Sequence, residues 1–113
     1  MINEILTAVG VEYRQGRFPS PPTETYAVYF DDVETEGADV LEGYDSAGWP
    51  RIYHHSVTVD VYEAQPDDAV EAAIEAELDA RGIPWSKEDR YWLQEVQRYQ
   101  VVYEFEYHTK RRI

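Results

Sequence analysis

The sequence has no cysteine, no long apolar run and no basic cluster near its first residue. Without cysteine the chain cannot form a disulfide or carry out thiol chemistry. No apolar stretch approaches the ~20 residues that a membrane-spanning helix needs. Residues 1–13 contain acidic side chains and no base, so we expect no secretory signal peptide. Together these absences favour a cytoplasmic protein without a membrane partner.

Basic residues are also scarce. The chain has 10 Lys and Arg against 23 Asp and Glu, a formal net charge of −13. Because nucleic-acid binding is driven by basic side chains that neutralise phosphates, this balance argues against it. Residues 31–45 hold seven acids and residues 60–79 hold eight, and neither segment contains a base. Such runs are usually solvated surface, but an asymmetric charge distribution can also steer self-assembly or binding of a basic partner.

The length of 113 residues predicts one domain with a single core. Aromatic residues make up 14% of the chain, which argues against disorder despite the charge. We expect an N-terminal helix and proline-rich connector over residues 1–23. A sheet and a second helix should occupy residues 24–108, and a basic tip should follow over residues 109–113.

Two helices are expected from apolar spacing. Residues 2–14 place apolar side chains on one stripe at helical intervals. The stripe consists of Ile2, Ile5, Leu6, Val9 and Tyr13. Residues 66–81 form the second helix, with Asp68 and Glu71 at capping-box spacing near its start. Gly82 follows its last turn, where a glycine commonly ends a helix.

Strands are expected where side chains alternate along the chain. Residues 25–31 alternate between two faces. Residues 51–63 place valines on one face and mostly polar side chains on the other, as in a sheet covered on one side. A short strand is also expected near residues 38–41, within the acidic segment.

Residues 83–108 are predicted to form two more strands. The second, residues 99–108, carries aromatics on one face and Glu104 and Glu106 on the other. No strong turn signal places the reversal between residues 86 and 98. The predicted class is therefore α+β: one mixed, mainly antiparallel sheet of four to five strands, with two amphipathic helices packed on one face.

The sequence offers little catalytic chemistry. His54 and His55 are adjacent on a strand and so should face opposite ways, which disfavours a shared metal. No nucleophile elbow, phosphate-binding glycine loop or calcium loop is present. The tyrosine-rich strands alternate with glutamates rather than bases, which argues against single-strand binding. We expect no catalytic residue, no metal site and no cofactor, and the chain is predicted not to be an enzyme.

Interface residues are instead expected where charge and aromatics gather in exposed segments. Aromatic residues are enriched in interfaces, and a tip opposite in charge to the body suits head-to-tail assembly. The candidates are Asp31, Asp32, Glu34, Asp39, Tyr44, Trp49, Lys110, Arg111 and Arg112.

Several segments resemble a known family. The stretch TYAVYFDDVETEGADVLEG and the region from His54 to Arg112 are similar to tail terminator, or tail completion, proteins of siphophages and prophages. The resemblance covers about residues 24–112, and the long insert YDSAGWPRIYHH departs from it. It implies an α+β domain that assembles as a hexameric ring, caps the tail tube and forms part of the head–tail joining interface.

The resemblance also implies the partners. These are further copies of the chain, the tail tube protein and head–tail connector proteins, in the virion tail or neck and in the host bacterial cytoplasm during assembly. DNA would pass through without specific binding. From the charge pattern we further hypothesise that some of the acids of residues 31–45, or of the helix over residues 67–81, line this channel and repel phosphates.

Three alternatives stay open from the sequence. One is a head–tail connector of the same gene region. Another is an acidic inhibitor or DNA mimic that binds a basic host protein. The third is a small enzyme that uses His54 or His55.

Overall fold

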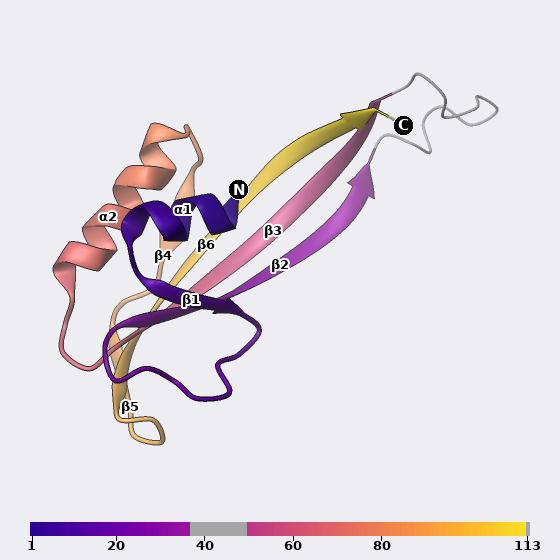
Figure 1. The fold of residues 1–113 in the computed structure, drawn as a ribbon. Coiled ribbons are helices and arrows are strands. Elements are labelled where there is room, and N and C mark those ends of the chain that lie inside the picture. The colour runs from indigo at the N-terminus through magenta and orange to yellow at the C-terminus, as the bar shows by residue number, and fades with distance from the viewer. Residues whose placement is uncertain (37–49, 113) are drawn as a thin grey trace.

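The computed structural model describes residues 1–36 and 50–112 (Figure 1), and within them the chain forms two helices and a six-stranded sheet. In chain order the elements are α1 (Ile2–Val9), β1 (Glu12–Gln15), β2 (Tyr26–Glu36), β3 (Pro50–Glu63), α2 (Asp68–Ala80), β4 (Trp85–Lys87), β5 (Tyr91–Leu93) and β6 (Arg98–Arg112). The sheet order is β1-β2-β3-β6-β4, and β5 also pairs with β6. Among the strand pairs of the described residues, only β1–β2 is parallel. The predicted α+β class is confirmed.

Both helices cover one face of the sheet, which we call the inner face (Figure 1). The alternation predicted for residues 51–63 holds: Val57, Val59 and Val61 are buried on the inner face. They pack with apolar side chains of both helices and with the aromatic face of β6. These partners are Ile5, Leu6, Ile74, Leu78, Tyr103, Phe105 and Tyr107. Burying this apolar surface holds the helices on the sheet.

Helix α1 ends at Val9, so the prediction of a helix through residue 14 is wrong. Gly10 adopts a left-handed conformation, φ 86°, and its N–H donates to the carbonyls of Leu6 and Thr7. The chain then turns into β1 instead of continuing the stripe. Tyr13 still joins the core, because its ring packs against Tyr29 at 6.2 Å between ring centroids.

Helix α2 begins at Asp68, two residues after its predicted start, and its N-cap lies one residue before the predicted capping residue. Asp67 is the N-cap, and its side chain accepts a hydrogen bond from the backbone N–H of Val70 at 3.2 Å. The predicted capping box of Asp68 and Glu71 is therefore wrong. At the other end, the N–H of Gly82 donates to Asp79 and that of Ile83 to Leu78. This is a Schellman ending, with Gly82 at φ 69° as expected.

The proline-rich connector between β1 and β2 crosses part of the opposite, outer face. Phe18 packs edge-on against Tyr26, 5.3 Å between ring centroids, and Tyr26 stacks on Tyr62 at 5.0 Å. The Arg98 guanidinium donates to the carbonyl of Thr23 at 3.1 Å. The connector therefore covers the outer face near the start of β2 only.

Strands β2, β3 and β6 continue past the helices as a three-stranded ribbon (Figure 1). Strand β1 pairs with β2 only at residues 26–29, and β4 pairs with β6 only at residues 103–105. We call the ribbon beyond these pairs the arm: residues 31–36, 50–56 and 106–112. Because β3 supplies a partner for every residue of β6 from Tyr99 through Arg112, the basic residues lie within a strand. The prediction of a basic tip past the sheet is corrected accordingly.

Strands β4 and β5 form one interrupted edge strand along β6. Lys87 lies opposite Tyr103, but Tyr91 lies opposite Gln100, so three residues of the edge strand face two of β6. This extra residue is a bulge. The reversal that the sequence left open lies between β5 and β6, at residues 94–97.

We expect the end of α2 to depend on the left-handed turn at Gly82. A Cβ at this position meets no atom within 4 Å, so replacement by alanine introduces conformational strain and no clash. Gly82→Ala should lower the free energy of unfolding by about 1 kcal/mol, measured by urea titration. Gly82→Asn is the matched control, because asparagine tolerates this conformation and should lose less. Equal stability of wild type and Gly82→Ala would contradict the prediction.

Candidate functional site

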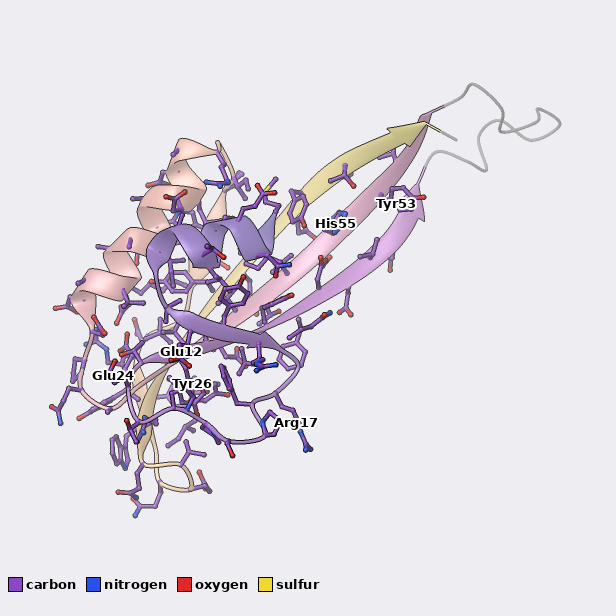
Figure 2. All side chains as sticks on the ribbon, viewed as in Figure 1. Glu12, Arg17, Glu24, Tyr26, Tyr53 and His55 are labelled. Atoms are coloured by element: carbon purple, nitrogen blue, oxygen red, sulfur yellow. The ribbon has the colours of Figure 1, made fainter. Side chains whose placement is uncertain are left out.

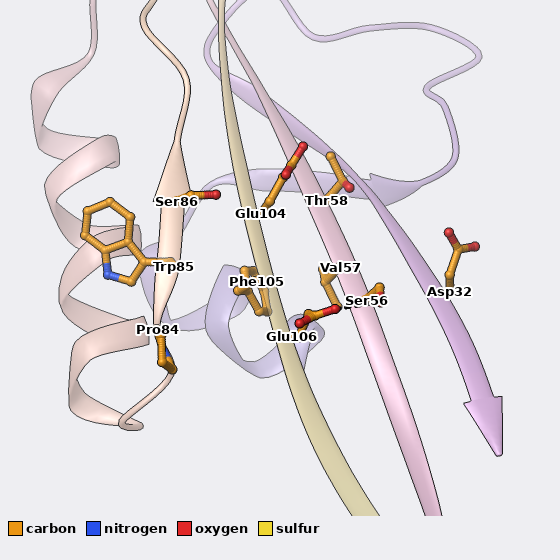
Figure 3. Close-up of a pocket in the computed structure, with 10 residues that line it drawn as sticks. All are labelled: Asp32, Ser56, Val57, Thr58, Pro84, Trp85, Ser86, Glu104, Phe105 and Glu106. Carbon is orange, nitrogen blue, oxygen red and sulfur yellow. Dashed lines mark hydrogen bonds between the residues drawn. The ribbon is translucent and has the colours of Figure 1, made fainter. Parts of the chain in front are cut away.

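Carboxylates gather on the outer face of the sheet. Strand register places Asp32 opposite Ser56, and Ser56 opposite Glu106, on this face. Thr58 likewise lies opposite Glu104. Asp32, Glu104 and Glu106 line an open depression of about 570 Å³, together with the hydroxyls of Ser56, Thr58 and Ser86 (Figure 3). Among the described residues that line it none is basic, so the depression suits a cationic partner and repels a phosphate.

The acidity of this face is reflected in Asp60. Its pKa is raised from the ordinary value first by burial and then by repulsion from Glu88 and Glu104. The repulsion shows that neighbouring carboxylates on this face are close enough to oppose one another's ionisation.

Histidines lie on both faces where the arm leaves the body. His55 is on the inner face (Figure 2), with its Nδ1 3.1 Å from Asp31 and its Nε2 3.0 Å from the Thr109 hydroxyl. Its ring stacks on Tyr107 at 4.4 Å. Burial first, and then the charge of Asp31, raises the pKa of Tyr107 to about 12. The ring of His55 is thus fixed at three points, as expected for a side chain that positions the arm.

His54 faces the other way, as predicted for adjacent residues of a strand. Its Nε2 lies 3.3 Å from Glu106, and its ring stacks on His108 at 4.7 Å. Over residues 1–36 and 50–112, no group of three or more histidine or acidic side chains is arranged to hold a metal ion.

A partly buried ion-pair network lies between α2, the end of β3 and the bulged edge strand. Glu63 is 0% exposed and Glu71 is also buried. Arg90 bridges them: its Nε is 3.3 Å from Glu63 and its Nη2 is 2.6 Å from Glu71. Lys87 reaches Glu71 at 2.9 Å and Glu75 at 2.8 Å. Two cations are therefore shared among four carboxylates, since Arg90 also pairs with the exposed Asp68 at 2.8 Å.

The pKa values of the two buried carboxyls of this network are shifted in opposite directions. Burial raises the pKa of Glu63 to about 7, with a further contribution from its hydrogen bond to Glu71. Burial also acts to raise the pKa of Glu71, but hydrogen bonds from Arg90 and Lys87 outweigh it and lower that pKa. Glu63 Oε2 is buried and has no hydrogen-bond partner among the described residues. A proton on Glu63 would let it donate to the Glu71 carboxylate.

The bulge explains how Arg90 reaches this network. Lys87 shares the inner face with Tyr103, whereas Tyr91 shares the outer face with Gln100. The additional residue between them lets Arg90 join Lys87 on the helix side. No sequence motif indicates this cluster, because its members are spread over residues 63–90. They come together only through the pairing of the edge strand with β6.

The predicted interface residues fall into three groups. Asp31 is half-buried and held by His55, whereas Asp32 and Glu34 are exposed on the arm. Lys110, Arg111 and Arg112 lie in β6 opposite the first residues of β3. Asp39, Tyr44 and Trp49, and the strand expected near residues 38–41, lie outside the described residues. The arm therefore brings the acidic and basic candidates that the structure describes into one ribbon.

No model of a known protein family matches the sequence, and no curated protein is significantly similar to it. In the part of the chain that the structure describes, neither helix is long and apolar enough to cross a membrane.

The raised pKa of Glu63 predicts a pH-dependent stability. The unfolded chain releases this proton near pH 4.5 and the folded chain near pH 7. Over that interval the folded state binds more protons, so the free energy of unfolding should fall as the pH rises, by up to about 3 kcal/mol, and level off above it. Glu63→Gln cannot ionise and should lack this decline.

The test is urea unfolding of wild type and variant at several pH values from about 4.5 to 8. The control is Glu95→Gln, because Glu95 is exposed in the loop between β5 and β6. If Glu63→Gln and wild type lose stability in parallel over this range, Glu63 is not the group responsible.

Proposed function

We propose that the chain is a structural phage assembly protein that caps the tail tube as a ring and forms part of the head–tail joining interface. The observation that carries this proposal is the arm: a three-stranded ribbon that projects past the helices and is charged along its length. An isolated domain gains little from such a ribbon, because most of it extends beyond the surface that the helices bury. A subunit of an assembly can use it to reach its neighbour.

The fold is also the one that the resemblance to tail terminators implies. The sheet has helices on one face only, so the opposite face stays available for another role. In a ring, one face of each sheet can turn toward the lumen while the helices lie outside. The resemblance and this arrangement support the same class of protein by separate routes.

The outer face is the better candidate for a DNA-facing surface than helix α2. In α2, Glu71 and Glu75 are paired with Lys87, and Glu77 is paired with Arg81. On the outer face, Asp32 and Glu104 are exposed around an open depression without a basic side chain among the described residues of its lining. A lumen lined by such carboxylates would repel phosphates and let a duplex slide.

The proposal predicts that the protein binds the end of a tail tube. Mixed with purified tubes that lack their own terminator, it should cap one end and stop further polymerisation, as seen by negative-stain electron microscopy. A connector of the same gene region would instead bind the head side. An acidic mimic would leave the tubes unchanged and bind a basic host protein. Tubes that continue to grow with the protein present would refute the proposal.

A second prediction concerns the lumen. Reversing Glu104 to lysine should leave ring assembly intact and slow or trap DNA, because phosphates would then be attracted to the wall. Glu104→Gln should have a smaller effect in the same direction. Glu95→Lys is the matched control, since Glu95 is exposed away from this part of the face. DNA ejection at the wild-type rate from all variants would rule out this lumen surface.

A further inference from the structure

The arm has two outer edges that face no strand among the described residues. Strand β2 meets β1 only as far as Tyr29, so the edge of β2 from Phe30 to Glu36 lies beyond it. Strand β6 meets β4 only at residues 103–105, so its edge from Glu106 to Arg112 lies beyond that pair. Long strand edges of this kind are templates for pairing with another chain.

The direction of the backbone groups on each edge follows from two hydrogen bonds. The carbonyl of Tyr29 accepts from Gly16 on the β1 side, so the odd-numbered residues of β2 direct their backbone groups outward. The carbonyl of Val102 accepts from Glu88 on the β4 side, so the even-numbered residues of β6 do the same. The arm thus presents backbone donors and acceptors at Asp31, Val33 and Thr35 along one edge. Along the other it presents those of Glu106, Lys110 and Arg112.

The two edges differ in charge. Strand β2 carries four acids and no base over residues 31–36: Asp31, Asp32, Glu34 and Glu36. Strand β6 ends in three consecutive bases: Lys110, Arg111 and Arg112. These runs lie at the same end of the sheet, on opposite sides of β3.

We propose that the arms of neighbouring copies of this chain pair edge to edge, with β2 of one copy parallel to β6 of the next. The inference deepens the ring of the proposed function and rests on it, by naming the surface through which the ring forms. Pairing β2 with β2, or β6 with β6, would oppose like charges, which is unfavourable across an interface. The β2–β6 contact is head-to-tail, and such contacts generate rings when the rotation closes.

The backbone geometry fits this pairing. Both strands run antiparallel to β3, so a neighbour that continues the sheet brings β2 parallel to β6. In a parallel pair, a residue whose backbone N–H and C=O point toward the neighbouring strand lies opposite a residue whose groups point away from it. Odd residues of β2 and even residues of β6 direct their groups outward, and even residues of both strands share the outer face. A parallel β2–β6 pair therefore satisfies the hydrogen-bonding pattern and keeps the outer faces of the two sheets continuous.

Charge also sets the register. Within one subunit Asp32 is level with Glu106, through their shared partner Ser56. A neighbour at equal height would bring these carboxylates side by side. A shift of four residues, about 13 Å, keeps even-numbered positions opposite even-numbered positions and places residue 32 opposite Lys110 and residue 34 opposite Arg112 in the strand register. Closed sheets require a stagger of this kind.

A charge swap tests the pairing. The first variant combines Asp32→Lys with Glu34→Lys, and the second combines Lys110→Glu with Arg112→Glu. Each should raise the dissociation constant for self-association at least about 10-fold, because like charges then meet. The variant with all four changes should return to near the wild-type value, since the attraction is restored with its sign reversed. Glu24→Lys with Glu95→Lys controls for net charge.

Sedimentation velocity over a range of concentrations supplies the constants, at low salt and at about 1 M salt, where screening shortens electrostatic reach to about 3 Å. Circular dichroism checks that each variant folds. If a reversed variant does not fold, Asp32→Asn with Glu34→Gln replaces it and should weaken association less.

Three results would overturn the pairing: a wild type that stays monomeric at low salt, half-swaps without effect, or no rescue in the fourfold variant. Tube capping separates this inference from the proposed function. Capping without charge-swap rescue would keep the function and reject the pairing. Rescue without capping would keep the pairing and reject the function.

Discussion

The structure depends on the unbroken register of β3 between β2 and β6. Eleven pairs join β2 to β3 and fourteen join β3 to β6, and no residue is skipped in either ladder. A slip of one residue would move the buried valines of β3 to the outer face and its threonine and aspartate into the core. The same ladder that builds the core therefore also builds the arm, so the position of every arm residue is fixed by packing beneath the helices.

Scarcity of cations shapes the rest of the molecule. With 10 bases against 23 acids, most carboxylates must stay solvated or share a partner. Arg90 forms ion pairs with three of them, Glu63, Asp68 and Glu71. Lys87 forms ion pairs with Glu71 and Glu75. The bases with described side chains are thus largely committed to holding the body together.

Local signals in the sequence predicted the fold well. Alternation fixed the faces of β3, and Gly82 marked the end of α2. The sequence could not show that Gly10 ends α1, because a single glycine inside an apolar stripe is often tolerated in a helix. It could not show the bulge before Arg90 either, because a bulge is a relation between two strands. The partly buried network and the continuation of β6 through Arg112 were missed for the same reason: both depend on long-range pairing.

The pairing of β3 with β2 on one side and β6 on the other has a mechanical consequence. A force applied along the arm acts parallel to the strands, so it loads the hydrogen bonds of the β2–β3 and β3–β6 pairs together and not one after another. Separation would require many backbone hydrogen bonds to break at once, whereas a force across the sheet would open them singly. The ribbon is therefore stiff along its length and compliant across its width. A neighbouring chain paired with its edge would stiffen it across its width.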